Sequence, residues 1–254
     1  MSVSNKQLEQ ISNSKTSNWF ASWFDSPYYH ILYKERDEME AQFFMDNIVH
    51  YLNLPKEAKI LDLACGKGRH SIYLNQMGYH VTGADLSSNS IAIAKKFETE
   101  TLKFVEHDMR TPFNQKFDAI FNLFTSFGYF ENEEDDFKTL ITIKNSISEY
   151  GFAVIDFMNV YNVLENLVPE EVKSVDQIDF KIKRFIKDGY IYKEIDFEDK
   201  GVKHHFTEKV KALTLEDFEN MMEKAGIFLL DVFGDYKLKK FHKKESERLI
   251  LIFK

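Results

Sequence analysis

The chain has 254 residues, 44% hydrophobic and 29% charged, with a formal net charge of −8 at pH 7. This length and apolar content suffice for one large domain, or for one domain with an insertion. The acidic balance argues against a broad phosphate-binding surface, and so against a nucleic-acid partner. No apolar run approaches the length of a membrane span, and neither a membrane partner nor a signal peptide is expected. The single cysteine, Cys65, excludes an internal disulfide, so a cytoplasmic location is predicted.

The N-terminal part divides into a polar tail and an aromatic-rich segment. Residues 1–17 are rich in Ser and Asn, so we expect a frayed end. Trp19 to Tyr33 carries many aromatic residues at irregular spacing, interrupted by Pro27. The predicted organisation is therefore a tail and aromatic lid segment over residues 1–36, followed by the main domain over residues 37–254.

Strand and helix signals then alternate along the chain, which predicts a parallel sheet covered on both faces. A helix is expected over about Asp37 to Leu52, where apolar residues recur at helical spacing. The expected strands are Lys59 to Ala64, His80 to Asp85, Leu102 to His107, Phe117 to Leu123 and Phe152 to Phe157. The helices between them are about Arg69 to Met77, Ser88 to Glu98 and Glu134 to Glu149.

The alternation breaks after Asp156, and an antiparallel insert is expected over about residues 160–213. Three strands are predicted, Phe180 to Ile186, Tyr190 to Phe197 and Val202 to Leu213, with a hairpin turn signal at Asp188-Gly189. A helix with Thr214 as its N-cap follows, and two final strands, Phe228 to Phe233 and Arg248 to Phe253, form a hairpin. The fold class is therefore α/β, a doubly wound, mostly parallel seven-stranded Rossmann-like sheet with an inserted antiparallel hairpin sheet after the fifth strand.

One segment carries the strongest functional signal. The apolar run that begins at Ile60 reaches Asp62, continues through Leu63-Ala64-Cys65 and ends in the turn Gly66-Lys67-Gly68. The next predicted strand ends in Asp85. A strand, a glycine turn, a helix and a second strand tipped by an acid form the template of a nucleotide-type cofactor site. A dinucleotide fingerprint needs a third glycine, but Arg69, His70 and Ser71 follow Gly68, so a nicotinamide dehydrogenase is disfavoured.

The ordered series of motifs resembles the class I S-adenosylmethionine-dependent methyltransferases. The matching segments are Asp62 to Gly68, then Asp85, then Val105 to Met109, Phe117 to Phe124 and Gly151 to Asp156. The resemblance covers roughly residues 20 to 160, and a Rossmann-like domain without a cofactor is the alternative. It implies a methyltransferase that uses S-adenosyl-L-methionine and needs no metal. The cofactor-binding residues that it implies are Tyr33, Arg36, Asp62, Ala64, Gly66, Gly68, Asp85, Leu86, Asp108, Met109, Leu123 and Phe124.

The resemblance also implies individual roles. Asp85 would bind the ribose and Asp108 the adenine amino group, while Asp62 would hold the loop or the cofactor amino group. Alternative roles remain for these residues. Asp85 would cap a helix, Asp108 would initiate a turn, and Gly66 and Gly68 would serve the turn alone. Arg36 would pair with the cofactor carboxylate, unless it is a surface charge.

The acceptor is constrained mainly by what is missing after the fourth strand. Asn122 to Tyr129 lacks the Pro-Pro motif of DNA and RNA amino-methyltransferases, and this pattern resembles enzymes acting on small molecules. We therefore predict methyl transfer to N or O of a small-molecule acceptor. A protein or RNA substrate and a catalytically silent cofactor-binding regulator are the alternatives. No catalytic base is identified, although four histidines are candidates: His30, His70, His204 and His205.

The insert is the predicted specificity element. It leaves the sheet at the edge where ligands bind, so an acceptor pocket is expected between it and Tyr28 to Tyr33. That pocket is predicted to be closed by Phe124 and Phe127 and to have aromatic walls and few charges. A homodimer built on the insert remains the alternative.

Overall fold

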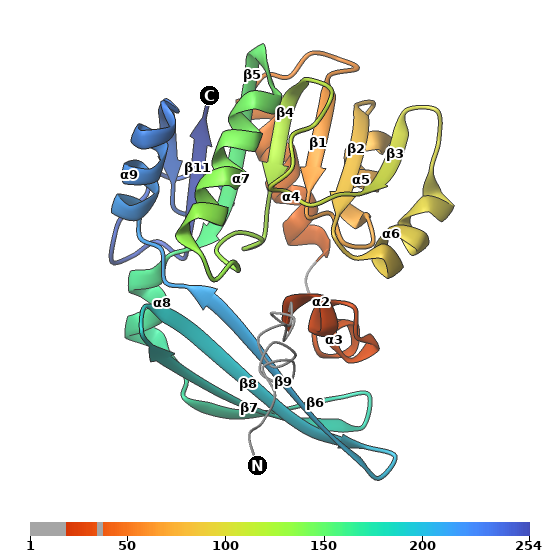
Figure 1. Ribbon diagram of the computed structural model, residues 1–254, viewed down its shortest axis with the longest axis vertical. Coiled ribbons are helices and arrows are strands. Elements are labelled where there is room, and N and C mark those ends of the chain that lie inside the picture. Colours follow the sequence, from red (N-terminus) through yellow and green to blue (C-terminus); the bar gives the residue numbers. More distant parts are fainter. Residues whose placement is uncertain (1–18, 35–37) are drawn as a thin grey trace, which may run out of the picture.

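The computed structural model describes residues 19–34 and 38–254. Within these ranges the chain forms a seven-stranded sheet in the order β10-β11-β5-β4-β1-β2-β3 and a separate four-stranded sheet, β6-β7-β8-β9 (Figure 1). The strands of the large sheet are β1 (Lys59–Leu63), β2 (His80–Asp85), β3 (Leu102–Glu106), β4 (Phe117–Asn122), β5 (Ile147–Met158), β10 (Leu229–Phe233) and β11 (Arg248–Phe253). All neighbours pair in parallel except β11, which is antiparallel to both β5 and β10. The expected doubly wound, mostly parallel sheet is confirmed.

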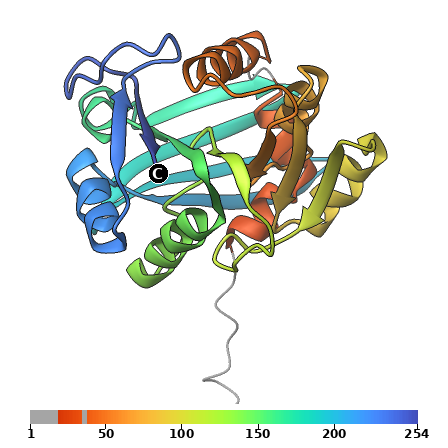
Figure 2. The same ribbon diagram turned by 90° about the horizontal axis from the view of Figure 1, so that it is seen from above.

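Helices cover both faces of the large sheet (Figures 1 and 2). On one face lie α4 (Glu38–Tyr51), α5 (Arg69–Gln76) and α6 (Ser88–Ala94), the last continuing into a 3-10 turn, η1 (Lys95–Phe97). On the other lie α7 (Glu133–Ser146) and α9 (Leu215–Ala225). Central strands supply both cores because side chains alternate along a strand: Ile60 packs under α4, whereas Leu61 packs on the α7 side. No helix in the described ranges is long and apolar enough to cross a membrane.

The strand order fixes where a ligand can bind. From β1 the chain winds outward through β2 and β3, and then returns to place β4 on the opposite side of β1. The connections after β1 and β4 therefore leave in opposite directions, which opens a crevice at the carboxyl ends of these two strands.

The insert after β5 contains more elements than the three predicted strands. It begins with α8 (Val160–Asn166) and continues as β6 (Glu170–Val175), β7 (Ile178–Lys187), β8 (Tyr190–Asp199) and β9 (Val202–Lys211). The prediction missed α8 and β6. β6 is an edge strand, paired with β7 alone, and half of its residues are exposed, so its apolar signal is weak.

The aromatic N-terminal segment, to which no helix was assigned from the sequence, folds as two short helices, α2 (Trp19–Phe24) and α3 (Pro27–Leu32). Pro27 begins α3, because a proline is favoured in the first turn and Ser26 caps the helix. These helices pack against the insert in a third apolar core that includes Trp23, Leu32, Phe180 and Ile195. In Figure 1 they lie between the insert and the carboxyl edge of the large sheet, which encloses the crevice.

Candidate active site

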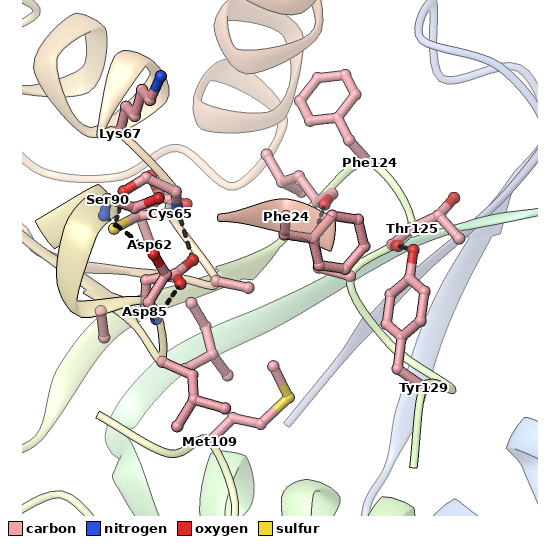
Figure 3. Close-up of a pocket in the computed structure, with 18 of the residues that line it drawn as sticks. Phe24, Asp62, Cys65, Lys67, Asp85, Ser90, Met109, Phe124, Thr125 and Tyr129 are labelled. Atoms are coloured by element: carbon pink, nitrogen blue, oxygen red, sulfur yellow. Dashed lines mark hydrogen bonds between the residues drawn. The ribbon is translucent and has the colours of Figure 1, made fainter. Parts of the chain in front are cut away.

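A cavity of about 450 Å³ occupies the crevice at the carboxyl ends of β1, β2 and β4. Its walls come from the loops after these strands, from α2 and α3, and from the insert. It brings together most of the residues that the sequence singled out, and Figure 3 shows several of them. Those that line it are Tyr33, Asp62, Ala64, Gly66, Asp85, Leu86, Asp108, Met109, Leu123 and Phe124. Arg36 lies outside the described residues.

The loop after β1 has a backbone that few residues adopt. Ala64, Gly66 and Gly68 have φ values of 66°, 55° and 83°. At Gly66 an added Cβ would meet nothing within 4 Å, so the backbone there adjoins open space on the cavity wall. A bare backbone beside a cavity lets a ligand approach closely, as a nucleotide-type cofactor requires.

Gly68 serves a different purpose from Gly66. It does not line the cavity, and it stands directly before α5 with its φ in the left-handed region. A Cβ at Gly68 would lie 2.4 Å from the Phe104 ring. The second glycine is therefore required by packing between the loop and β3.

Asp85 holds the glycine loop in place. Its Oδ2 accepts a hydrogen bond from the Gly66 N–H at 2.8 Å, and its Oδ1 accepts one from the Ser87 N–H at 2.8 Å. Although Asp85 ends its strand, its side chain is partly buried, and burial raises its pKa. The helix-capping role belongs to Ser87, whose hydroxyl accepts from the Ser90 N–H at 2.9 Å. Since a carboxylate oxygen has more than one lone pair, Asp85 keeps capacity for a ligand hydroxyl.

Asp62 and Cys65 lie deeper. Asp62 is 3% exposed and accepts a hydrogen bond from the Ser71 hydroxyl at 2.6 Å. Burial raises the pKa of Asp62 to about 6, with Ser71 opposing the shift. Burial likewise raises the pKa of the Cys65 thiol, which therefore stays protonated at neutral pH and is no nucleophile.

The segment after β3 forms a charged corner of the cavity. Asp108 makes an ion pair with Arg110 at 2.5 Å, and Arg110 also pairs with Asp135 at 2.9 Å. The guanidinium of Arg110 lowers the pKa of Asp108. The Arg110 and Thr111 N–H groups bond back to Asp108, so it does initiate a turn while lining the cavity.

Two apolar side chains extend the wall of the cavity beside Asp85 and Asp108. They are Met109 and the exposed Leu86. With Gly66 and the two acids, this set fits a nucleoside-type ligand, which needs hydroxyl acceptors and flat apolar surfaces.

The turn after β4 has a strained backbone, and hydrogen bonds with β5 and β11 hold it in place. Phe124 and Thr125 both have positive φ, 57° and 61°, which is uncommon for such residues. The buried carboxylate of Asp156 accepts from the Phe124 N–H at 2.8 Å and from Arg248 Nε at 2.8 Å. Arg248 also donates to the Thr125 hydroxyl at 3.0 Å. A strained backbone that is held this firmly is typical of a functional site.

A second cavity, also of about 450 Å³, adjoins the first beyond this turn. Both cavities share Arg69, Phe124, Thr125, Tyr129 and Glu208 as wall residues. Figure 3 shows Thr125 and Tyr129 on the side of the first cavity away from Asp85, with Phe24 between. The remaining wall of the second cavity comes from α4, β5, β11 and the insert with α8, through Glu40, Met158, Val163, Leu167, Arg184, Ile191, Lys193, Val210 and Arg248.

The expectation of a pocket with few charges was wrong, because the second cavity has several charged wall residues. Arg184, Lys193 and Glu208 are direct cross-strand neighbours on β7, β8 and β9, so they form one row on the face of the insert that lines the cavity. Phe127, expected to close the pocket, is buried in the core and lines neither cavity.

The four candidate histidines separate into two groups. His30 and His70 line the first cavity, and His70 stacks on Phe124 with ring centres 4.6 Å apart. His204 instead stacks on Phe197 within the insert, and the exposed His205 pairs with Asp196. Glu208 was not predicted as a site residue, because its position on the cavity wall depends on how the insert packs.

Known proteins carry the same domain. The family model described as "Methyltransferase domain" matches residues 60–144. The Bacillus subtilis (strain 168) protein "Putative methyltransferase YqeM" is 25% identical over 204 residues, 72% of this chain and 79% of that protein. The glycine/sarcosine N-methyltransferase of Aphanothece halophytica is 25% identical over 233 residues, 86% of this chain and 83% of that protein.

The fold extends to solved structures. The crystal structure of an S-adenosylmethionine-dependent methyltransferase from Clostridium acetobutylicum ATCC 824 superposes with a TM-score of 0.75 at 24% identity, covering 93% of this chain and 98% of that one. The sheet order, the Asp62–Gly68 loop with Asp85, and the matched domain agree with one another. The chain is a class I S-adenosylmethionine-dependent methyltransferase, an enzyme with S-adenosyl-L-methionine as its methyl donor.

Proposed function

We propose that this enzyme transfers the methyl group to N or O of a small-molecule acceptor. The observation that carries the proposal is the second cavity, which shares a wall with the cofactor cavity and is bounded by the insert, α8 and the β4 turn. Its volume of about 450 Å³ lies in the range of small-molecule sites. A macromolecular substrate would instead need an open surface at this edge. The relative named as a glycine/sarcosine N-methyltransferase supports an acceptor of this size class.

The chain's own residues supply position and shape. S-adenosylmethionine, when bound, supplies a methyl group activated on a sulfonium. Asp85, Gly66 and Met109 would hold the nucleoside, and the braced Phe124–Thr125 turn would separate donor from acceptor. Holding the acceptor atom about 3 Å from the methyl carbon and in line with it accounts for much of the acceleration in such a reaction. Phe24 of α2 and Tyr29 of α3 line the cofactor cavity and would help to exclude water from it.

The proposal is tested with methyl-labelled S-adenosylmethionine and a cell extract fractionated into small molecules, protein and RNA. Label should enter the small-molecule fraction only, and the Asp85→Ala variant should transfer at least about tenfold less at limiting cofactor. Label in protein or RNA would contradict the proposal. Cofactor binding without transfer to any fraction would favour the regulator alternative.

A further inference from the structure

We propose that Glu208 is a catalytic residue that receives the positive charge of an amine acceptor as the methyl group arrives. The inference rests on the proposed small-molecule function and narrows the acceptor to an amine nitrogen. Glu208 is the carboxylate common to the walls of both described cavities, so it stands where donor and acceptor meet. The other acids of the cofactor cavity do not line the second cavity: Asp62 lies near the end of β1, Asp85 is the last residue of β2, and Asp108 follows β3.

The carboxylate of Glu208 is held in one orientation. Its Oε1 accepts hydrogen bonds from Trp23 Nε1 at 2.7 Å and from the Tyr33 hydroxyl at 2.6 Å. Lys193 donates to the same Tyr33 hydroxyl, and its Nζ lies 3.9 Å from Glu208 Oε2. One oxygen is thus fixed by two donors, and Oε2, with a longer contact to Lys193, is the atom available to a ligand. Side chains from α2, from the residue that ends α3 and from β8 converge on Glu208, and a surface charge without a function would not require this support.

Among the described residues, two of the four cations that line the second cavity pair with carboxylates other than Glu208. Arg184 pairs with Glu171 at 2.5 Å, and Arg248 pairs with Asp156 at 2.8 Å. Lys193 faces Glu208 itself, and Arg69 lies over the Phe124 ring at 5.8 Å. Glu40 adds a further acid from α4. The cavity therefore carries no block of unmatched positive charge large enough to exclude an ammonium group beside Oε2.

The chemistry of methyl transfer gives this carboxylate its task. A neutral amine nitrogen forms a bond to the methyl carbon, the carbon–sulfur bond breaks, and its electron pair stays on sulfur. The positive charge moves from sulfur to nitrogen, and the methylated ammonium later loses a proton to solvent. A fixed negative charge beside the nitrogen stabilises that charge as it develops, and no proton needs to move in the transfer itself. A hydroxyl acceptor would need a base at this point instead.

The rest of the second cavity suggests the shape of a suitable probe. Met158, Val163, Leu167, Ile191 and Val210 form an apolar wall. A ligand with an apolar body and a terminal ammonium would place the body on this wall and the charge at Glu208. The pair 2-phenylethylammonium and 2-phenylethanol differs in this charged group and keeps the body constant.

The experiment measures the affinity of both probes by calorimetry for protein saturated with S-adenosylhomocysteine. The wild type should bind the ammonium probe at least about tenfold more tightly than the alcohol. Glu208→Gln should remove this preference and leave the alcohol's affinity unchanged. Glu194→Gln is the matched control, because Glu194 on β8 lies next to Lys193 and so points to the opposite face of the insert.

The outcomes separate the inference from the function on which it rests. Equal affinity of the wild type for the two probes would overturn the inference without any variant. So would an unchanged ammonium preference in a Glu208→Gln protein that binds S-adenosylhomocysteine normally. Labelled methyl transfer to alcohols but not to amines would also overturn it while leaving the proposed function intact. Absence of transfer to any small molecule would instead defeat the proposed function.

Discussion

At the scale of single residues, Asp85 has two tasks that one substitution will remove together. Its carboxylate anchors the Gly66 and Ser87 N–H groups, and we expect it to accept hydrogen bonds from the cofactor ribose. Asp85→Ala should lower the affinity for S-adenosylhomocysteine by at least about tenfold, since a hydrogen bond to a charged group contributes about 1.5–3 kcal/mol. Calorimetry measures this.

Asp85→Asn is the milder substitution, because the amide keeps one acceptor oxygen for one of the two N–H groups, Gly66 or Ser87. A folded Asp85→Ala protein with undiminished affinity would show that the ribose lies elsewhere.

The buried carboxyl group of Asp62 should make the free energy of unfolding depend on pH. Its pKa is about 6 in the folded protein against 3.8 for the free side chain, so the folded state binds more protons between these values. Stability therefore falls as pH rises through this window, by about 3 kcal/mol from this group. Asp62→Asn removes the titration and keeps an acceptor for Ser71.

Urea unfolding without cofactor checks this dependence. The free energy of unfolding of Asp62→Asn, minus that of the wild type, should increase as the pH rises from 4 to 7. A difference between the two proteins that does not vary with pH would contradict the predicted role of burial.

At the scale of elements, the turn after β4 depends on a carboxylate from β5 and a guanidinium from β11. Asp156 is fully buried and holds both the Phe124 N–H and Arg248. Asp156→Ala should cost about 3 kcal/mol of unfolding free energy, the lower end for a broken buried pair, because the Arg248 side chain is 20% exposed.

The control for Asp156→Ala is Glu219→Ala on the exposed face of α9, which should change stability by less than about 0.5 kcal/mol. If the two substitutions changed the free energy of unfolding equally in urea, the hydrogen bonds of Asp156 would not stabilise the turn.

At the scale of the whole molecule, α2 and α3 join the insert to the cofactor cavity. Tyr29, His30 and Tyr33 line the cavity, while Trp23 and Leu32 pack into the insert core. Binding of S-adenosylhomocysteine should therefore slow amide hydrogen exchange in α3, because local opening must then release the ligand. The β8–β9 turn at Lys200-Gly201, outside both cavities, serves as the internal reference. Equal slowing at both places, or at neither, would contradict a lid role for α3.

The fold could be predicted from the sequence because its signals are local. Strand–helix alternation, the hairpin signal at Asp188-Gly189 and the Thr214 cap each depend on a few adjacent residues, and the structure has all of them. The errors fall where tertiary packing outweighs local pattern. The exposed edge strand β6 lacks a buried face, and α2 with α3 owes its burial to a distant insert.

The candidate site also has one part that local sequence predicts and one part that depends on tertiary packing. The sequence by itself was enough to predict that Asp62, Gly66 and Asp85 meet at one cavity, because they lie at or just after the carboxyl ends of the adjacent strands β1 and β2. Only the tertiary structure revealed the proposed acceptor side, where Glu208 meets Trp23 and Tyr33 from the far end of the chain. Their approach depends on the packing of the insert against α2 and α3, and such long-range contacts leave no periodic or spaced pattern in a single sequence. The purpose of Gly68, too, became visible only once Phe104 was seen against it.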